Sequence, residues 1–470
     1  MSATIFTIKR SEIEKRLDPF FYRPDFMQLE NAIKNAGALP LRNYVRGIAS
    51  GATPKTDQCE KYYSDKQNGI PFLRVQNLSP TSILNYEDCK YINKETHENM
   101  LYRSQVNEGD LLVKITGVGR MAIASVAPKD FVGNTNQHMC VIKTDDERTS
   151  WILAAWLNTD IAEKLASRRA TGGTRPALDY PALLSLPIIF DERIYETMKN
   201  AVSEMKQKQQ QAKQLLDSID SYLLDELGIT LPKKDNSLSK RIFTTKFSEV
   251  SGGRWDAYYN NQYYSDFDIQ IESTNFSKDV LKNICSYTSG VVYSSSDERN
   301  IGKTILRANN INLETNEVDL KDIKYIDSNI ELDDSMKLRS NDIFICTASG
   351  SKEHAGKVAF IEDDTDLYFG GFMGVLRVFN KNVHPRYLFE YLASCIFRTH
   401  LFRNLGGTNI NNINFTMLSP LKIPLPPLPK QKEIASHIRE VREQAKQLQE
   451  EAEQTMQEAK KQIEKMILGE

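Results

Sequence analysis

Two stretches of the chain repeat apolar residues at alternating steps of four and three, the spacing that forms the seam of a coiled coil. They predict helices over Asp191–Leu227 and Lys430–Leu468, each about 55 Å long. Both stretches end in Leu-Gly, and glycine can adopt the left-handed conformation that ends a helix. The seam residues are Met198, Val202, Met205, Ala212, Leu216, Ile219 and Leu223 in the first helix and Ile434, Ile438, Val441, Ala445 and Leu448 in the second.

Small and polar side chains weaken both seams. Alanines recur in them, and Gln209 occupies a seam position of the first helix. Each helix therefore buries too little apolar area to be stable alone. Two helices of similar length with matching ends most simply pack on each other, and we expect an antiparallel pair. The alternative is two independent coiled coils that bind other partners.

Outside these helices the pattern changes to short apolar runs bounded by Gly, Ser and Asn. Leu111–Ile115 and Ile343–Cys346 have the length of buried strands. An apolar helix candidate follows each run, Trp151–Leu165 in the first half and Arg386–Phe402 in the second. Each half is therefore expected to mix strands and helices before its long polar helix.

The chain repeats itself once. Five short segments of the first half recur in the second half in the same order and at a nearly constant separation, which is too long for a solenoid and indicates a duplicated domain. The pairs are Leu41–Tyr44 with Leu281–Ile284, Phe72–Asn77 with Ile305–Asn310, Gly109–Val113 with Asn341–Ile345, Gly172–Thr174 with Gly406–Thr408, and Leu227–Gly228 with Leu468–Gly469.

These patterns predict an α+β protein with two tandem mixed α/β domains, separated by two long helices that form an antiparallel coiled coil. The expected divisions are residues 1–190 for the first domain, 191–228 for the first long helix, 229–245 for a linker, 246–428 for the second domain and 429–470 for the second long helix.

The charge balance restricts the ways in which the chain could bind nucleic acid. Its net charge is −2 at pH 7 and its sequence pI is about 6.4, whereas a nucleic-acid-binding domain is usually basic. Contacts to DNA would then come from local patches or from a more basic partner. Two segments carry basic residues and no acidic ones, residues 166–178 and 397–432. Ordinary solvated surface is the alternative for either patch.

The spacing of the cysteines and the hydropathy of the chain indicate the cellular compartment of the protein. Met1–Arg10 lacks the apolar run of a signal peptide, and no stretch approaches the roughly 20 apolar residues of a membrane span. The six cysteines lie far apart without a Cys-x-x-Cys pair, which fits a reducing compartment and argues against a zinc module. We expect a cytoplasmic protein that does not contact a membrane.

Several motifs resemble the specificity domains of Type I restriction–modification systems. In the first half these are Ile70–Leu78, Gly109–Gly117 and Asn136–His138; in the second they are Ala348–Ser351, Gly356–Ala359, Gly406–Thr408 and Leu425–Ile434. There are departures from the family pattern. Leu186–Asp191 lacks the double proline and the Gln-Lys-Glu of the family's helix start, and Gly370–Gly374 stands where Asn-Gln is expected.

The resemblance implies a two-domain reader of double-stranded DNA. Each domain of such a subunit reads one half of a split, asymmetric target, and the helix pair fixes the spacing between the halves. The family implies as partners two methyltransferase subunits, which carry S-adenosylmethionine and modify adenine, and optionally two motor–nuclease subunits, which use ATP and Mg²⁺. No cofactor is expected in this chain itself.

A search for catalytic motifs agrees with a non-catalytic role. The chain lacks the short Pro-Pro-Tyr-type loop of an amino-methyltransferase and the glycine-rich phosphate loop of a nucleotide-driven motor. Three alternatives remain: a specificity subunit of a related non-Type-I defence or methylation system, a stand-alone enzyme, and a coiled-coil scaffold that does not bind DNA. The scaffold leaves the duplicated domains and their basic loops without a purpose.

Base reading requires side chains that hydrogen-bond base edges, Arg or Lys for guanine and Asn or Gln for adenine. Loops at equivalent places in both halves carry such side chains, although the Gly-Gly-Thr turns could instead cap helices. The candidates are Thr53, Lys55, Arg120, Arg168, Arg169, Thr174 and Arg175 in the first half, and Arg299, Lys303, Ser349, Ser351, Lys352, Lys357, Thr408 and Asn409 in the second.

Overall fold

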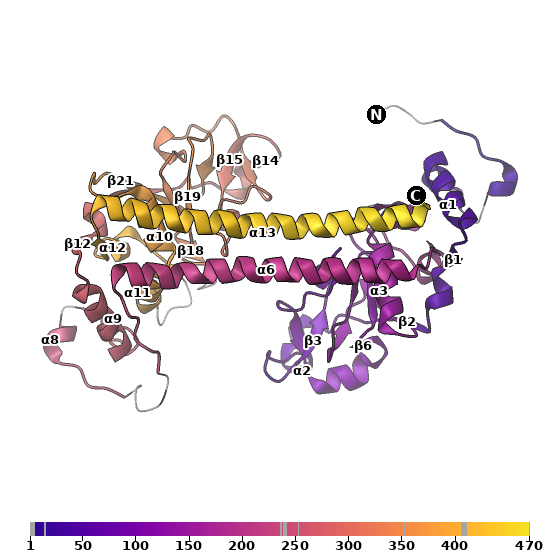
Figure 1. Cartoon of the computed structure of the whole chain (residues 1–470), viewed down its shortest axis with the longest axis horizontal. Helices are drawn as coiled ribbons and strands as arrows, with labels where there is room; N and C mark the ends of the chain where they lie inside the picture. Colours follow the sequence, from indigo (N-terminus) through magenta and orange to yellow (C-terminus); the bar gives the residue numbers. More distant parts are fainter. Residues whose placement is uncertain are drawn as a thin grey trace. The chain divides into compact units, whose positions relative to one another are not determined.

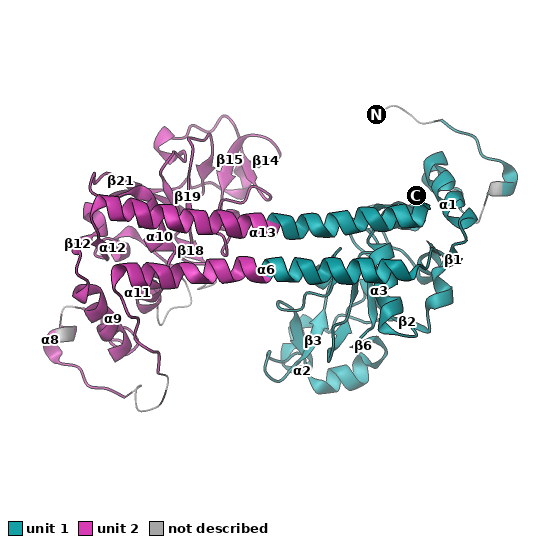
Figure 2. Cartoon of the chain, in the orientation of Figure 1, with its two compact units in different colours: residues 1–209, 450–470 teal, residues 210–449 magenta. Residues whose placement is uncertain are grey.

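The computed structural model describes residues 5–13, 16–235, 237, 242–251, 253–350, 354–405 and 411–469. They form two compact units, drawn in different colours in Figure 2. Unit 1 comprises residues 1–209 and 450–470, and unit 2 comprises residues 210–449. Each unit contains a sheet-rich head and one half of each long helix. Head one is the part of unit 1 before the first long helix, and head two is the part of unit 2 between the long helices.

Two main sheets build head one. The larger has the order β2-β10-β7-β8-β4, and the smaller has the order β5-β3-β9-β6, in which β3 and β9 are parallel. The strands are β1 Leu39–Pro40, β2 Gly47–Ser50, β3 Ile70–Leu73, β4 Ser82–Ile83, β5 Lys90–Ile92, β6 Gln105–Asn107, β7 Leu111–Lys114, β8 Ala124–Val126, β9 Val132–Thr135, β10 Met139–Lys143 and β11 Pro187–Ile188, which pairs with β1.

Head two repeats four strands of the larger sheet and three of the smaller one in the same order. Its sheets have the orders β13-β21-β17-β19 and β14-β16-β15-β20, and β15 and β20 are again parallel. The strands are β12 Ser277–Val280, β13 Cys285–Ser289, β14 Glu298–Arg299, β15 Lys303–Leu306, β16 Lys324–Ile326, β17 Ile343–Cys346, β18 Ala348–Ser349, β19 Val358–Phe360, β20 Tyr368–Phe369, β21 Met373–Val378, β22 Asn411–Asn412 and β23 Lys422–Leu425. The shared strand order and the shared parallel pair confirm the predicted duplication.

Each head also contains short helices (Figure 1). They are α1 Pro24–Asn35, α2 Cys59–Tyr62, α3 Glu147–Leu157, α4 Asp160–Arg169 and α5 Tyr180–Leu184 in head one, and α8 Phe247–Val250, α9 Gln262–Ser273, α10 Pro385–Ala393, α11 Cys395–Leu405 and α12 Phe415–Leu418 in head two.

The prediction of a single helix after the strands of each head is wrong. Two helices are found there in each head. In head one the break lies at Asn158 and Thr159. The Thr159 side chain accepts a hydrogen bond from the backbone N–H of Ala162 at 3.1 Å and so caps α4. The Asn158 side chain donates to Ser82 Oγ and to the carbonyl of Ala124 in β8. In head two the break between α10 and α11 lies at Ser394.

The long helices are α6, Glu192–Leu227, and α13, Leu428–Leu468. In unit 1, Lys208 of α6 lies 3.5 Å from Glu451 and 3.4 Å from Thr455 of α13. In unit 2 the Lys430 ammonium lies 2.7 Å from the Glu226 carboxylate. Within each unit the helices therefore run in opposite directions, which confirms the antiparallel pairing.

None of the twelve predicted seam residues is exposed. Leu216, Val441 and Leu448 are half-buried. The buried ones are Met198, Val202, Met205, Ala212, Ile219, Leu223, Ile434, Ile438 and Ala445. Gly228 and Gly469 end the helices with φ of +64° and +75°, the left-handed conformation expected of them.

Each head packs on both long helices of its unit. In unit 1 one apolar cluster joins the fully buried Trp156 of α3 to Met198 of α6 and Ile463 of α13. In unit 2 the equivalent cluster joins Tyr387 of α10 to Leu223 and Ile438. The helix seams are thus completed by the heads, which explains how helices with so many alanines are stabilised. No helix in the described part of the chain is both long and apolar enough to span a bilayer.

Candidate nucleic-acid interface

Loops of head one meet at one polar surface, the head-one loop surface. It consists of residues 51–55, Arg74, residues 115–117, residues 136–138 and residues 171–177. Thr53 Oγ1 donates to Gln137 Oε1 at 2.6 Å, which joins the first loop to the one after β9. The backbone N–H of Asn136 donates to the Leu73 carbonyl at 3.2 Å, which places the Arg74 turn beside them.

Backbone contacts attach the remaining loops to this surface. The N–H groups of Ile115 and Thr116 donate to the His138 carbonyl at 3.0 and 3.2 Å. The N–H of Gly117 donates to the Pro176 carbonyl at 3.1 Å, next to the exposed Arg175. Three of the sequence-predicted loops, which lie far apart along the chain, are therefore brought together.

Gly51 is needed where the first loop passes the end of β9. A Cβ atom at this position would lie 1.7 Å from the Thr135 carbonyl oxygen, closer than any side chain permits. Gly290 in head two has the same role, because a Cβ there would lie 2.2 Å from the Gly370 carbonyl oxygen. The two heads therefore bring their first loop to the sheet end by the same close approach.

Head two builds the equivalent surface, the head-two loop surface. It consists of residues 290–293, Arg307, residues 347–349, residues 370–372 and residues 411–412. The N–H groups of Thr347 and Ala348 donate to the Phe372 carbonyl at 2.9 and 3.2 Å, which repeats the contact to His138. The N–H of Gly370 donates to the Leu306 carbonyl at 2.9 Å, which repeats the contact to Leu73.

Four candidates of the first half lie on the head-one loop surface with exposed side chains: Thr53, Lys55, Thr174 and Arg175. Their role in binding DNA stays a prediction. Arg120 is held inside head one instead. Its guanidinium donates to the carbonyls of Asn158 and Thr159 and pairs with Asp160 and Glu163 at 3.1 and 3.2 Å. It therefore caps the end of α3, and its expected exposure in a free loop is wrong.

Arg168 and Arg169 do not belong to an exposed basic patch, which corrects the sequence-based interpretation. Their side chains are 4% and 8% exposed, and both pair with the carboxylate of Glu30 on α1. Burial acts to raise the pKa of Glu30, but Arg169, Lys34 and Arg168 outweigh it and lower that pKa. The two arginines therefore attach α4 to α1 and are not available to a ligand.

Head two repeats this ion pair, so its role is structural in both halves. Arg403 Nε donates to the Tyr259 carbonyl at 3.0 Å and its guanidinium contacts Asp268 at 2.5 Å. Arg168 Nε makes the same bond to the Phe21 carbonyl at 2.6 Å. In the second basic segment, Lys422 pairs with Glu272 and Lys430 pairs with Glu226. Acidic residues from other parts of the sequence therefore neutralise much of both segments.

A second duplicated contact escaped the sequence analysis. Arg16 donates to Asp18 at 2.8 Å and to the Arg169 carbonyl at 2.7 Å. Arg254 donates to Asp256 at 2.8 Å and to the Asn404 carbonyl at 2.7 Å, at the end of the equivalent helix. The repeated Arg-x-Asp spacing was the signal that could have revealed it. The duplicated contact adds a further pair of matching segments to the internal repeat, at the start of each head.

The candidates of head two have mixed positions. Arg299 pairs with Asp327 at 3.0 Å, Lys303 donates to the Ile330 carbonyl at 2.5 Å, and Ser349 is half-buried in β18. Lys357 is buried and donates to the Ile311 carbonyl at 2.8 Å, and burial lowers its pKa. Its expected place in a DNA-facing loop is therefore wrong. Ser351, Lys352, Thr408 and Asn409 lie outside the described residues.

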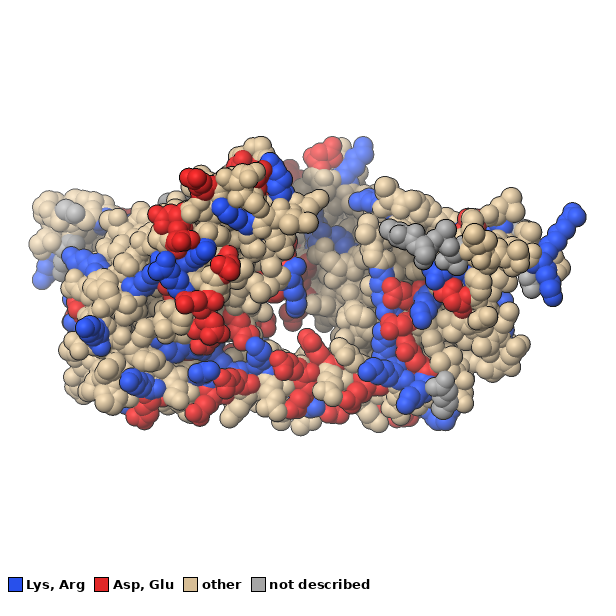
Figure 3. Space-filling model, turned by 90° about the horizontal axis from the view of Figure 1, so that it is seen from above, with Lys and Arg blue, Asp and Glu red and all other residues tan. Residues whose placement is uncertain are grey.

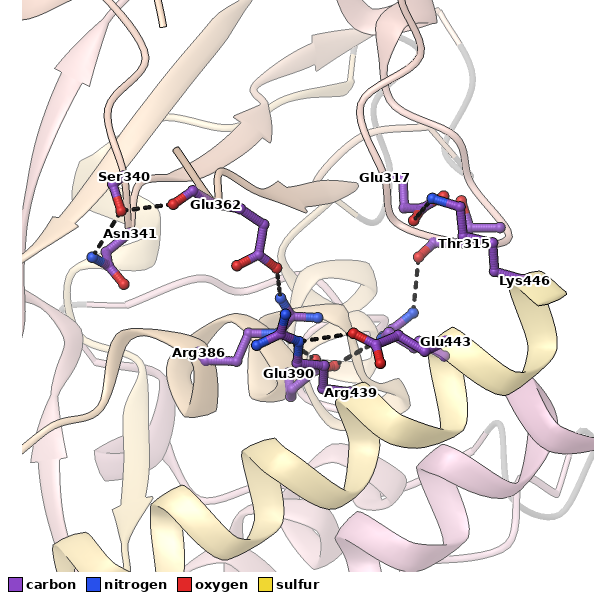
Figure 4. A network of polar contacts seen from close by, with 11 residues as sticks. Thr315, Glu317, Ser340, Asn341, Glu362, Arg386, Glu390, Arg439, Glu443 and Lys446 are labelled. Atoms are coloured by element: carbon purple, nitrogen blue, oxygen red, sulfur yellow. Dashed lines mark hydrogen bonds and ion pairs between the residues drawn. The ribbon is translucent and has the colours of Figure 1, made fainter. Parts of the chain in front are cut away.

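Polar contacts attach head two to α13 (Figure 4). The buried Glu390 accepts from Arg386 at 3.0 Å and from Arg442 of α13 at 2.9 Å. Arg442 also donates to the Thr315 carbonyl at 3.0 Å, and Lys446 pairs with Glu317 at 3.0 Å. Breaking such a buried pair by removing one partner is costly, so this network fixes the head on the helix.

A carboxylate of a long helix holds the second helix of each pair. The N–H of Cys395, the first residue of α11, donates to Asp220 of α6 at 2.9 Å. The N–H of Asp160, the first residue of α4, donates to Glu464 of α13 at 2.6 Å. A negative charge at a helix N-terminus is favourable. On the face seen in Figure 3, acidic and basic side chains are interspersed.

The architecture defines a class: a duplicated sheet-and-helix protein whose two heads present equivalent loop surfaces and are carried on antiparallel helices. Residues 275–455 match the family model of the Type I restriction modification DNA specificity domain. Over these residues, which are less than half of its length, the chain is similar to the DNA specificity domains of type I restriction–modification systems.

Two curated relatives are specificity subunits of type I restriction enzymes. The EcoKI specificity subunit of Escherichia coli (strain K12) is 31% identical over 162 residues, which are 34% of this chain and 34% of the relative. The StySPI specificity subunit of Salmonella potsdam is 34% identical over 134 residues, 28% of each chain. The chain thus spans about a third of the length of the curated relatives it matches.

A chain from a solved structure, described for complex assembly and conformational transition of the type I R-M system, has a TM-score of 0.43 and 15% identity, covering 92% of this chain and 96% of that one.

Proposed function

We propose that this chain reads a split, asymmetric site in double-stranded DNA and directs partner methyltransferase subunits to it. The observation that carries the proposal is the pair of loop surfaces. Both are built from the same backbone contacts, yet they present different side chains, as two readers of two different half-sequences would. The specificity-subunit names of the two curated relatives support the same function.

Chemistry belongs to the partners in this proposal. Two methyltransferase subunits would bind S-adenosylmethionine and modify an adenine flipped out of the duplex. Two motor–nuclease subunits, which use ATP and Mg²⁺, would join in a restriction-competent complex. The near-neutral reader would rely on these partners for much of the phosphate contact. A type I system is favoured over a related non-Type-I system because of the match to the specificity-domain family.

The decisive experiment maps methyladenine across the source genome by single-molecule sequencing, with this gene intact and deleted. The proposal predicts that one split, asymmetric methylated motif disappears on deletion. An unchanged methylation map, with the gene shown to be expressed, would contradict it.

Arg175 offers a test on the purified complex. Its side chain is exposed on the head-one loop surface, so Arg175→Ala should weaken binding to the target duplex about 5-fold or more while subunit assembly is unchanged. Binding is measured by fluorescence anisotropy at physiological salt, and assembly by gel filtration. Unaltered affinity would remove Arg175 from the interface without affecting the proposed function of the chain.

A further inference from the structure

The duplication allows each residue of one loop surface to be compared with its counterpart in the other. Shared backbone contacts fix the correspondence: Gly51 matches Gly290, Arg74 matches Arg307, and His138 matches Phe372. We expect a side chain that is the same at equivalent positions of the two loop surfaces to have a function common to both heads. A side chain that differs between them is expected to have a function specific to its own head.

Both heads have an arginine directly after the first strand of their parallel pair. Arg74 directly follows β3 and Arg307 directly follows β15. In each case the next turn is fixed by an asparagine, because Asn77 and Asn310 each accept the arginine's own backbone N–H at 2.8 Å. The backbone of both arginines is therefore held in the same way.

The side chains of these two arginines are incompletely paired. The Nε atoms of both are buried and have no hydrogen-bond partner within the described part of the chain. A buried donor without an acceptor is unfavourable. Arg307 contacts Asp322 at 3.1 Å, but that carboxylate is 70% exposed, and an exposed ion pair is weak. Both arginine residues are partly exposed, so an anion arriving at either loop surface would pair with the accessible part of the guanidinium.

A tyrosine accompanies each arginine. Burial raises the pKa of Tyr63 and the positive charge of Arg74 opposes that rise. Burial likewise raises the pKa of Tyr293, and Arg307 opposes it. Tyr63 Oη donates to the Pro54 carbonyl at 2.9 Å, which links the arginine to the first loop of the surface. In each head the arginine therefore lies close to a partly buried tyrosine.

Neighbouring positions differ in chemistry. Head one presents Thr53, which hydrogen-bonds Gln137, and His138, whose ring lies 3.3 Å from the Gln137 amide. Head two has apolar side chains here: Val292 is 92% exposed and Phe372 is 73% exposed. A Cβ atom placed on Gly371 would lie 3.3 Å from the Cγ2 atom of Val292, so Val292 lies against Gly371. Two large apolar side chains so exposed in an otherwise polar surface have no packing role within the head.

We propose that Arg74 and Arg307 are equivalent contacts to the DNA backbone, one in each head, and that Thr53 and His138 in head one and Val292 and Phe372 in head two read the bases beside them. This inference rests on the proposed function. A phosphate contact carries no sequence information, so one arginine serves both heads. Apolar side chains contact the 5-methyl group of thymine, whereas hydroxyl and imidazole groups hydrogen-bond base edges. Head two therefore prefers thymine at the position that Phe372 meets.

The arginine part is tested with the full-length chain in complex with its methyltransferase partner. The probes are a random-sequence duplex pool and one fixed duplex of arbitrary sequence. Arg74→Ala and Arg307→Ala should each weaken binding to the fixed duplex about 5- to 10-fold and reduce the slope of log affinity against log salt by about one. The half-sequences selected from the pool should stay the same. The matched control is Arg46→Ala, because Arg46 is an exposed arginine of head one that pairs with Asp145.

The base-reading part uses exchanges between the heads. The double variant Val292→Thr with Phe372→His should remove the thymine preference from one half of the selected motif and leave the other half unchanged. The reciprocal variant Thr53→Val with His138→Phe should alter only the opposite half. Melting temperatures verify that each variant is folded.

The outcomes separate the two levels of inference. A wild-type complex that selects no sequence from the pool overturns the proposed function and this inference with it. A wild-type complex that selects a split motif, while the arginine variants keep the full salt slope, overturns the backbone contact alone. Selected motifs that survive both double exchanges overturn the base-reading assignment.

Discussion

Arg168 and Arg403 lie in the last turns of equivalent helices, and each pairs with a carboxylate of the helix that precedes the sheets. In the sequence, Arg168 is a candidate DNA contact because its neighbours along the chain contain no acidic residue. Its actual partner, Glu30, is far away in sequence and reaches it only through the packing of α1 on α4. Charge within a short window therefore predicts exposure poorly, because tertiary ion pairs lie outside the window.

Removing the arginine should leave the buried Glu30 with Arg169 and Lys34 as its cationic partners. We expect Arg168→Ala to lower the free energy of unfolding of unit 1 by about 1–3 kcal/mol, because a buried hydrogen bond between charged groups is lost. Denaturant unfolding followed by circular dichroism measures it. Arg175→Ala is the matched control and should leave stability unchanged, because that side chain is exposed. Equal stability of both variants would contradict the buried pair.

We expect His400 to make unit 2 sensitive to acid. Burial lowers its pKa to about 4, and its Nε2 atom has no hydrogen-bond partner among the described residues. The unfolded chain takes up this proton near pH 6.5 and the folded chain does not, so stability falls as pH drops from about 6.5 towards 4. Between pH 7 and 5 the loss should be roughly 1–2 kcal/mol. His400→Gln should reduce it, and the exposed His354→Gln should not; an identical acid response in all three proteins would contradict this role.

At the scale of elements, the sequence predicted the long helices closely. Their heptad pattern persists over many turns, and a long regular pattern is hard to produce by chance. The break between α3 and α4 was missed because the intervening Asn158 and Thr159 interrupt no hydrophobic pattern. Their side chains act through bonds to β8 and to the next helix's backbone, which only the folded arrangement brings near.

The small residues of the seam set the approach of the two helices. Ala445 is 1% exposed, so a larger side chain there would push α13 from its neighbours. We expect Ala445→Leu to lower the free energy of unfolding by about 1–3 kcal/mol. Gln444→Leu adds a similar side chain at an exposed position and should have little effect. Thermal unfolding compares the two, and a stabilised Ala445→Leu protein would show that the seam is underpacked instead.

At the scale of the whole molecule, internal repetition was the most informative signal in the sequence. Five loose motif pairs were enough to predict two domains with one topology, because both halves solve the same packing problem. The sequences of the loops alone did not predict which of their side chains lie together in a site. Thr53 and Gln137 approach each other only through turns whose geometry depends on close contacts such as that at Gly51.

Helix length is expected to determine the spacing of the two half-sequences that the proposed function requires. Inserting seven residues after Gln209 and seven before Glu450 would keep the seam in register and lengthen both helices by about 10 Å, or about three base pairs of DNA. The selected gap should grow by that amount while both half-sequences stay the same. Motif selection from a random duplex pool measures it. A gap that keeps its original length would contradict the role of the helices as spacer.

Unit 2 is one continuous stretch of chain, whereas unit 1 is assembled from two stretches that flank it. Ala452, Met456, Ala459, Ile463 and Ile467 of the second stretch belong to the core of unit 1. During synthesis on the ribosome, residues 210–449 emerge before these five side chains do. The core of unit 1, although most of it is translated first, can therefore be completed only after all of unit 2 has been made.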